Sequence, residues 1–167
     1  MQFFDEKFKT NKLRYILQSM LATLCVFIVL IILSAKENAA IIGAIGASSF
    51  IAFTIPKAQV SRSKFLIGGY VVGIISGWVC YNLSLLQIFV NQPLISAHLP
   101  IIFSAIAIGL AIFLMVITNN EHPPAAGIAL GLVLNGCTFK SVVVILFGIV
   151  VLCVLKKMLE PVLENLL

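Results

Sequence analysis

Long apolar stretches separated by short polar junctions make up most of this chain. Membrane-spanning helices need about twenty mainly apolar residues, and most of these stretches approach or exceed that length. The stretches are residues 13–33, 39–55, 65–90, 100–117, the apolar part of 118–136, and 139–155. The pattern predicts an all-α integral membrane protein with about six transmembrane helices.

The fifth stretch, Thr118–Gly136, differs from the others. It begins with polar residues and two prolines, and its apolar run is too short for an ordinary spanning helix. We expect a short or broken helix whose polar start lies at membrane depth. Pro123 and Pro124 suit a first helical turn, where a missing N–H costs nothing, and His122 or Asn120 is placed to cap it.

Such a helix start can bind an anion without a charged side chain. The N–H groups of Ala125, Ala126 and Gly127 are expected to be free and to point outward, where the helix carries partial positive charge. This stretch is therefore the candidate substrate site.

The polar junction of this stretch has a counterpart in the first half of the chain. Shifting the sequence by 84 positions, half its length, places residues 34–47 on residues 118–131. The aligned pairs include Ser34 with Thr118, Glu37 with Glu121, Asn38 with His122, and Gly43 with Gly127. Two units of three helices must have opposite orientations in the membrane, so we predict two inverted three-helix repeats, as in many transporters.

The repeat defines the predicted organisation and completes the candidate site. Residues 1–12, with phenylalanines at helix-like spacing, are expected to lie at the membrane interface, followed by one membrane domain over 13–167. Repeat one covers about 13–90 and repeat two about 100–160. The predicted substrate-binding residues are Asn38, Asn119, Asn120, His122, Pro123, Pro124, Ala125 and Gly127.

The basic residues predict the orientation in the membrane. With six crossings, nine lysines and arginines lie on one side and two on the other. The nine are Lys7, Lys9, Lys12, Arg14, Lys57, Arg62, Lys64, Lys156 and Lys157, and the two are Lys36 and Lys140. Cytoplasmic loops are rich in lysine and arginine, so both termini are predicted to be cytoplasmic, in a bacterial inner membrane. The alternative is five crossings plus a re-entrant helix, which leaves seven lysines and arginines on the first side.

Three features of the sequence each allow two interpretations: a glycine stripe, two glutamates and His122. Gly69, Gly73 and Gly77 form a stripe that favours close helix packing over a pore lining, within one subunit or in a homo-oligomer. Glu37 and Glu121 adjoin apolar segments, where a buried carboxylate costs on the order of 3 kcal/mol, so they either couple protons or sit at the interface as capping charges. His122 is either a cap, or an anion donor or proton carrier.

The amino-acid composition excludes most classes of protein other than integral membrane proteins. Hydrophobic residues make up 61% of the chain and charged residues 10%, far from the values of soluble domains. The net charge of +5 lies mostly at the chain ends and one loop, which indicates contact with anionic lipid and not with nucleic acid. Four cysteines occur singly, with no metal-ligand spacing, and no nucleophile, phosphate-loop or paired-acid motif is present. We expect no catalytic residues, no metal and no cofactor.

The triplet His122–Pro124 followed by small residues resembles the HPP family of small integral membrane proteins. The upstream residues Gly46, Ala47, Ser48, Pro56, Gly68, Gly69 and Gly73 are similar to that family's other patterned region, although Tyr70 stands where a histidine is common. The resemblance implies a membrane transporter, with some members regarded as nitrite carriers. Two hypotheses follow: a transporter or channel for a small anion such as nitrite, or a non-transporting membrane scaffold or assembly protein.

Overall fold

The structure is a computed structural model that describes residues 6–33, 39–91 and 96–166. All of its regular elements within these ranges are helices, which confirms the predicted all-α fold. They are α1 (Glu6–Thr10), α2 (Lys12–Leu33), α3 (Ala39–Thr54), η1 (Gln59–Ser61), α4 (Ser63–Ser84), α5 (Gln87–Val90), α7 (Leu99–Ile117), η2 (Pro123–Ala125), α8 (Ala126–Asn135), α9 (Phe139–Leu159) and η3 (Glu160–Val162).

Four helices are long and apolar enough to cross a membrane. Their spans are Lys12–Ile31, Ser63–Ser84, Leu99–Ile117 and Phe139–Val162, while α3 and α8 are shorter apolar helices. Each half of the chain therefore has a long, a short and a long helix in that order. The protein is an integral membrane protein by the length and composition of these helices.

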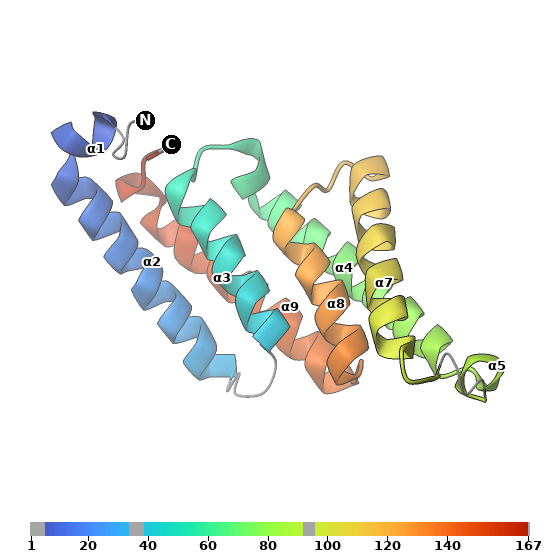
Figure 1. The fold of residues 1–167 in the computed structure, drawn as a ribbon. Helices are drawn as coiled ribbons and strands as arrows, with labels where there is room; N and C mark the ends of the chain where they lie inside the picture. Colours follow the sequence, from blue (N-terminus) through green and yellow to red (C-terminus); the bar gives the residue numbers. More distant parts are fainter. Residues whose placement is uncertain (1–5, 34–38, 92–95, 167) are drawn as a thin grey trace.

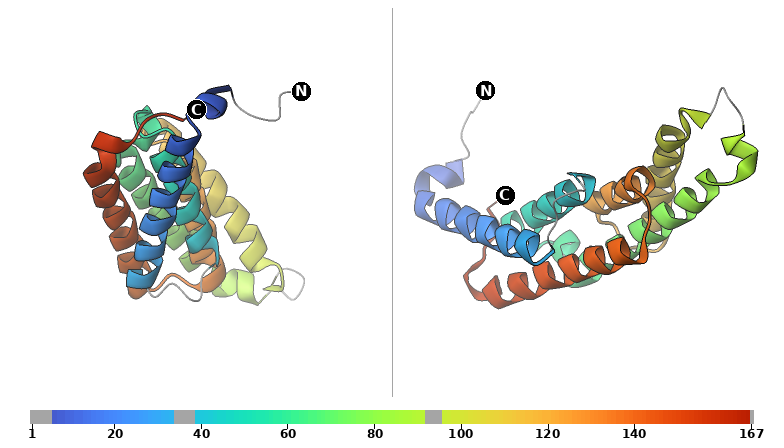
Figure 2. Two further views of the ribbon diagram at one scale, coloured as in Figure 1. Left: turned by 90° about the vertical axis from the view of Figure 1, so that its left-hand side faces the viewer. Right: turned by 90° about the horizontal axis from the view of Figure 1, so that it is seen from below.

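The six main helices form two rows. Helices α2, α3, α8 and α7 lie side by side in one row, and α9 and α4 lie behind them (Figures 1 and 2). The short helices α3 and α8 occupy the centre and run in opposite directions, as do the equivalent outer helices α2 and α7. This arrangement is the one that two inverted three-helix units produce.

The broken fifth helix reaches across the bundle in two parts. After α7 the chain passes back into the bundle as a non-helical segment and then forms η2 and α8 (Figure 1). Helix α8 alone has 10 residues, about half a spanning helix. The non-helical segment supplies the remaining length. Its His122 side chain is buried, whereas Thr118, Asn119 and Glu121 are exposed.

The third helix is shorter than predicted. Its apolar pattern predicted a helix as far as Val90, but α4 ends at Ser84, and the short helix α5 follows. The Asn82 side chain donates to the Trp78 carbonyl, and the Ser84 hydroxyl donates to the Tyr81 carbonyl at 2.7 Å. Polar side chains that bind nearby carbonyls in this way favour helix ends over helix interiors.

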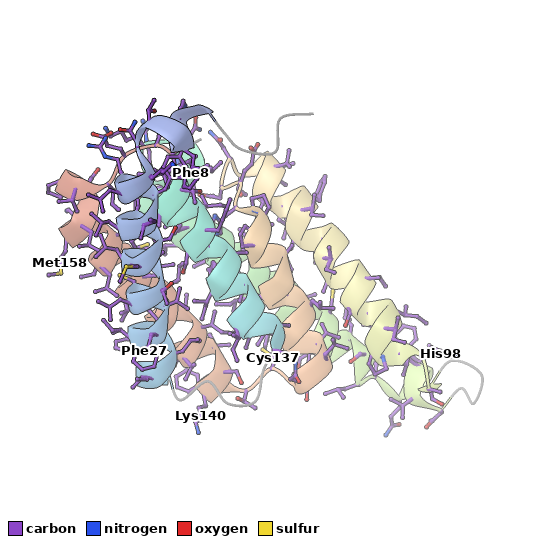
Figure 3. All side chains as sticks on the ribbon, turned by 60° about the vertical axis from the view of Figure 1, so that its left-hand side comes forward. Phe8, Phe27, His98, Cys137, Lys140 and Met158 are labelled. Atoms are coloured by element: carbon purple, nitrogen blue, oxygen red, sulfur yellow. The ribbon has the colours of Figure 1, made fainter. Side chains whose placement is uncertain are left out.

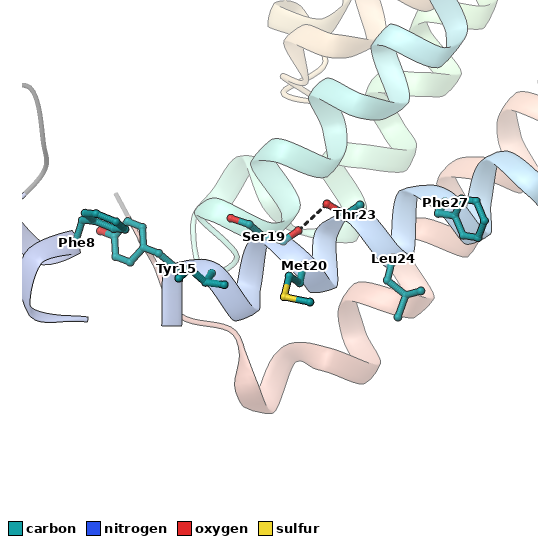
Figure 4. Close-up of a pocket in the computed structure, with 8 residues that line it drawn as sticks. Phe8, Tyr15, Ser19, Met20, Thr23, Leu24 and Phe27 are labelled. Carbon is teal, nitrogen blue, oxygen red and sulfur yellow. Dashed lines mark hydrogen bonds between the residues drawn. The ribbon is translucent and has the colours of Figure 1, made fainter. Parts of the chain in front are cut away.

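The outer surface is apolar, as a lipid-facing surface requires. Phe27 is 58% exposed and Met158 is 73% exposed, and both point away from the bundle (Figure 3). An apolar groove follows the outer face of α2 (Figure 4). Its lining residues are Phe8, Tyr15, Ile16, Ser19, Met20, Thr23, Leu24 and Phe27. The only internal hydrogen bond drawn there joins the Thr23 hydroxyl to the Ser19 carbonyl, as is usual within a helix.

The beginning and the end of the described chain meet at one end of the bundle. Arg14 forms an ion pair with Glu164, and the Tyr15 hydroxyl donates to the Leu166 carbonyl at 2.6 Å. The Leu166 N–H donates to the Thr54 carbonyl at 2.8 Å, which adds the end of α3 to this group. The start of α2 and the segment after α9 therefore lie at the same end of the bundle.

Candidate functional site

His122 lies directly before η2, and its side chain is completely buried. Its Nε2 atom is 2.8 Å from the Ser48 hydroxyl oxygen of α3, and the Tyr70 hydroxyl of α4 is 2.9 Å from the same oxygen. Ser48 and Tyr70 are also completely buried. These three residues, called the His122 cluster below, form a hydrogen-bonded polar group inside an apolar helical bundle.

The hydrogen bonds of the cluster permit either tautomer of the His122 imidazole. The Ser48 hydroxyl has one hydrogen but three neighbours, because the Ala44 carbonyl also lies 2.8 Å away. If Ser48 donates to Ala44 or to Tyr70, then His122 carries its hydrogen on Nε2 and donates to Ser48. If Ser48 instead donates to His122, the imidazole hydrogen is on Nδ1. The second arrangement makes Nδ1 a hydrogen-bond donor.

The Nδ1 atom of His122 is the unfilled position of the cluster. It is buried and has no hydrogen-bond partner among the described residues. The backbone of Val60, in η1, lies beside the imidazole without forming a hydrogen bond of normal geometry. Buried polar atoms are nearly always paired, so an unpaired ring nitrogen at this depth indicates a position that a ligand or water can occupy.

The backbone at the start of the broken helix differs from the expectation of three free donors. The Ala125 N–H donates to the His122 carbonyl at 2.9 Å, and the Ala126 N–H donates to the carbonyls of Pro123 and Pro124. A first turn of 3₁₀ geometry closes these bonds and uses groups that an α-helix leaves free. The side chain of His122 also makes no capping bond, so the predicted cap is wrong.

Glycines of α4 allow the segment before and within α8 to approach closely. A Cβ atom on Gly69 would lie 2.5 Å from the Cβ of His122, and one on Gly77 would lie 3.0 Å from the Ala129 carbonyl. A Cβ atom on Gly73 would overlap with the Ala125 carbonyl. The three glycines contact one continuous segment, and this contact places His122 within reach of Tyr70.

The other predicted substrate residues lie around this position. Asn119 is exposed and has a φ of 53°, a left-handed conformation that asparagine tolerates in turns. Asn120 donates from its side chain to the Thr118 carbonyl at 3.0 Å. Gly127 faces α3, where its added Cβ would be 3.5 Å from that of Ala44.

A small groove opens beside the cluster on the α7 side. Its lining residues are Ile112, Met115, Val116, Glu121, His122, Pro123 and Ala126. Glu121 is exposed, so it sits at the rim and not in the buried cluster. Its repeat counterpart Glu37 and the predicted site residue Asn38 lie outside the described residues. Within the described ranges, no three His, Cys, Asp or Glu side chains gather as metal ligands.

Sequence reasoning did not assign Ser48 and Tyr70 to the site, and it placed Lys156 at a polar chain end. Lys156 is buried, with 7% of its surface exposed, and its Nζ donates to the Ser61 carbonyl at 2.5 Å. A signal for its burial exists in the sequence. Ile145, Ile149 and Leu152 are buried on one face of α9, and position 156 continues that face by one turn.

These features define the class of protein: a membrane-embedded helical bundle of two inverted units, with a broken helix and a buried polar cluster at the break. Comparison with known families then gives a specific result. A family model described as HPP, transmembrane region, matches residues 8–163, so the chain belongs to this family and the resemblance in its motifs is confirmed. Searches of curated proteins and of solved structures found no match.

Proposed function

We propose that this protein is a carrier or channel for a small inorganic anion, with nitrite as the first candidate. The observation that supports this most is the completely buried His122 cluster with its unpaired Nδ1 atom. Polar groups inside a membrane bundle are costly and usually mark a substrate or ion pathway. Membership of the HPP family adds the expectation of transport.

In this proposal the anion takes the place of the missing partner of His122. A small anion offers only hydrogen-bond acceptors, so it selects the arrangement in which Nδ1 carries the hydrogen. Ser48 then donates to Nε2, and Tyr70 donates to Ser48, so the two hydroxyls fix the ring and its tautomer. Pro123 and Pro124 restrict the backbone that follows, which holds the imidazole in place before the anion arrives.

We further propose that the protein works in the bacterial inner membrane with both termini in the cytoplasm. It contacts lipid, binds no nucleic acid and is not an enzyme. The glycine stripe on α4 is used for packing inside one subunit. A homo-oligomer would use a different surface.

A scaffold role is the second candidate, and one observation favours it. Gly69, Gly73 and Gly77 each contact the segment from His122 to Ala129 so closely that this segment could serve helix packing alone. In that case the His122 cluster would fix the segment and would never contact a solute.

Uptake of labelled nitrite into liposomes containing the purified protein separates the two functions. We expect protein-dependent uptake that responds to an imposed membrane potential, with labelled urea as the neutral control solute. No uptake of any small anion above that of protein-free liposomes would favour the scaffold.

A Glu121→Gln variant tests whether the rim carboxylate couples protons. Glu121 is exposed and outside the buried cluster, so we expect it to be a surface charge. Glu121→Gln should then accumulate nitrite to the wild-type level under an imposed pH gradient. Loss of that accumulation, with uptake driven by membrane potential unchanged, would identify a coupling acid instead.

A further inference from the structure

Lys156 is a buried cation, and none of the described carboxylates forms an ion pair with it. Burial of a charged group is costly unless the charge is paired. No described carboxylate lies within ion-pair distance of Lys156. Glu160, one turn later in η3, has an exposed side chain, and its charge acts on Lys156 only from a longer distance. The neighbouring Lys157 is exposed, so burial is specific to position 156.

The ammonium group of Lys156 has hydrogens to spare. It can donate three hydrogen bonds, and one goes to the Ser61 carbonyl. The hydroxyl of Ser61 is itself buried and has no hydrogen-bond partner among the described residues. The Lys156 ammonium group, which has two further hydrogens to donate, therefore lies beside η1, where the Ser61 hydroxyl is also unpaired.

The same turn connects Lys156 to the His122 cluster. Val60 precedes Ser61 in η1, and the Val60 backbone lies beside the His122 imidazole. Val60 therefore lies beside the unpaired Nδ1 of His122, and the next residue, Ser61, has an unpaired hydroxyl and a carbonyl that accepts from Lys156. All three groups can donate hydrogen bonds to an acceptor.

We propose that Lys156 and Ser61 form the charged part of the anion site, and that the site selects small monovalent inorganic anions. This inference rests on the proposed transport function. The His122 cluster contributes neutral donors, while Lys156 contributes the positive charge that balances a dehydrated anion. Hydrogen bonds between charged groups are roughly twice as strong as neutral ones, so this lysine contributes a large share of the affinity.

The surroundings of the turn suit an anion that enters from this end. Lys57, Arg62 and Lys64 flank η1 in the sequence and have exposed side chains. A cluster of exposed positive charge raises the local anion concentration and the association rate. Lys156 would then receive an anion already concentrated at the surface.

The test uses the full-length protein in four variants and two measurements. Lys156→Met removes the charge, and Ser61→Ala removes the unpaired hydroxyl but keeps the carbonyl that binds Lys156. Lys156→Arg keeps the charge, and Lys157→Met is the matched control on the exposed face. The measurements are the KM for nitrite uptake in liposomes and the rise in unfolding temperature when sodium nitrite, in place of sodium gluconate, is added to detergent-solubilised protein.

We expect Lys156→Met to raise KM about tenfold or more, because a buried charge-assisted hydrogen bond is lost. The nitrite-dependent rise in unfolding temperature should disappear with it. Ser61→Ala should raise KM about threefold, as for a neutral hydrogen bond, and Lys156→Arg should restore part of the affinity. Lys157→Met should match the wild type in both measurements.

Unchanged KM and an unchanged nitrite-dependent rise in both Lys156→Met and Ser61→Ala would overturn the proposal and make the Lys156 contact purely structural. If Lys156→Met does not fold, Ser61→Ala alone decides by the same criteria. A wild-type protein that nitrite stabilises through Lys156 and Ser61, but that moves no nitrite, would support the site and reject transport. A wild type with neither response would reject both.

Discussion

Ser48 has the central place in the buried cluster, because its hydroxyl oxygen contacts both Tyr70 and His122. Its neighbour Ser49 is buried to nearly the same extent, but its hydroxyl bonds only to the Ile45 carbonyl one turn earlier. The two serines therefore form a matched pair for measuring the cluster.

Ser48→Ala should destabilise the protein much more than Ser49→Ala. Removing the Ser48 hydroxyl leaves Tyr70 and His122 with unpaired buried groups, each of which costs about 1–3 kcal/mol. Ser49→Ala loses only a bond within one helix, so a change below about 1 kcal/mol is expected. Reversible unfolding in detergent measures both, and equal losses would show that the cluster contributes no more than an ordinary serine.

The pattern of apolar and polar positions could not distinguish these two serines, although Ser48 belongs to the region that resembles the HPP family. Both lie in an apolar helix, and a hydroxyl there can always bond to the carbonyl one turn earlier, as both do here. Ser48 is selected by contacts with residues 22 and 74 positions away. Such contacts depend on how helices pack, which a single sequence does not state, whereas the polar His122 at a helix start was visible in it.

At the scale of helices, the approach of α4 to the segment His122–Ala129 is the most sensitive contact. Gly73→Leu should lower the free energy of unfolding by about 3 kcal/mol or more, at the upper end of the cost of overpacking. The new side chain would overlap with the Ala125 backbone carbonyl, which cannot move aside as a flexible side chain can. Gly109→Leu is the control, since a Cβ on that exposed glycine of α7 meets nothing within 4 Å.

The two variants can be compared by their melting temperatures in detergent. We expect a clear decrease for Gly73→Leu and almost none for Gly109→Leu. Similar melting temperatures would contradict the close packing of α4 against the broken helix.

The helices themselves were largely predictable, and their ends were less so. Apolar length identified α2, α3, α7 and α9 to within a few residues, because lipid contact requires continuous apolar surface. The end of α4 at Ser84 was not predicted, because the apolar pattern continues to Val90. The 3₁₀ turn at Pro123–Ala125 likewise changed which N–H groups are free, although the helix start itself was predicted correctly.

For the whole molecule, the two inverted units place the basic residues at one end. The loop around η1, the start of α2 and the end of α9 all lie there, while Lys140 lies at the opposite end (Figures 1 and 3). We therefore expect reporter fusions at either terminus to report the cytoplasm, and a reporter inserted beside Lys140 to report the other side. A C-terminal fusion on the outer side would contradict six crossings.

The central claim is that the His122 cluster contacts a moving anion, and the initial rate of nitrite uptake in liposomes tests it most directly. The chain supplies its own control, because its second histidine, His98, is exposed at the far end of the bundle (Figure 3). His122→Ala should reduce the rate about tenfold, as expected when a buried donor to an anion is lost, and His98→Ala should leave it within about twofold of the wild type. A folded His122→Ala protein that takes up nitrite at the wild-type rate would contradict the account.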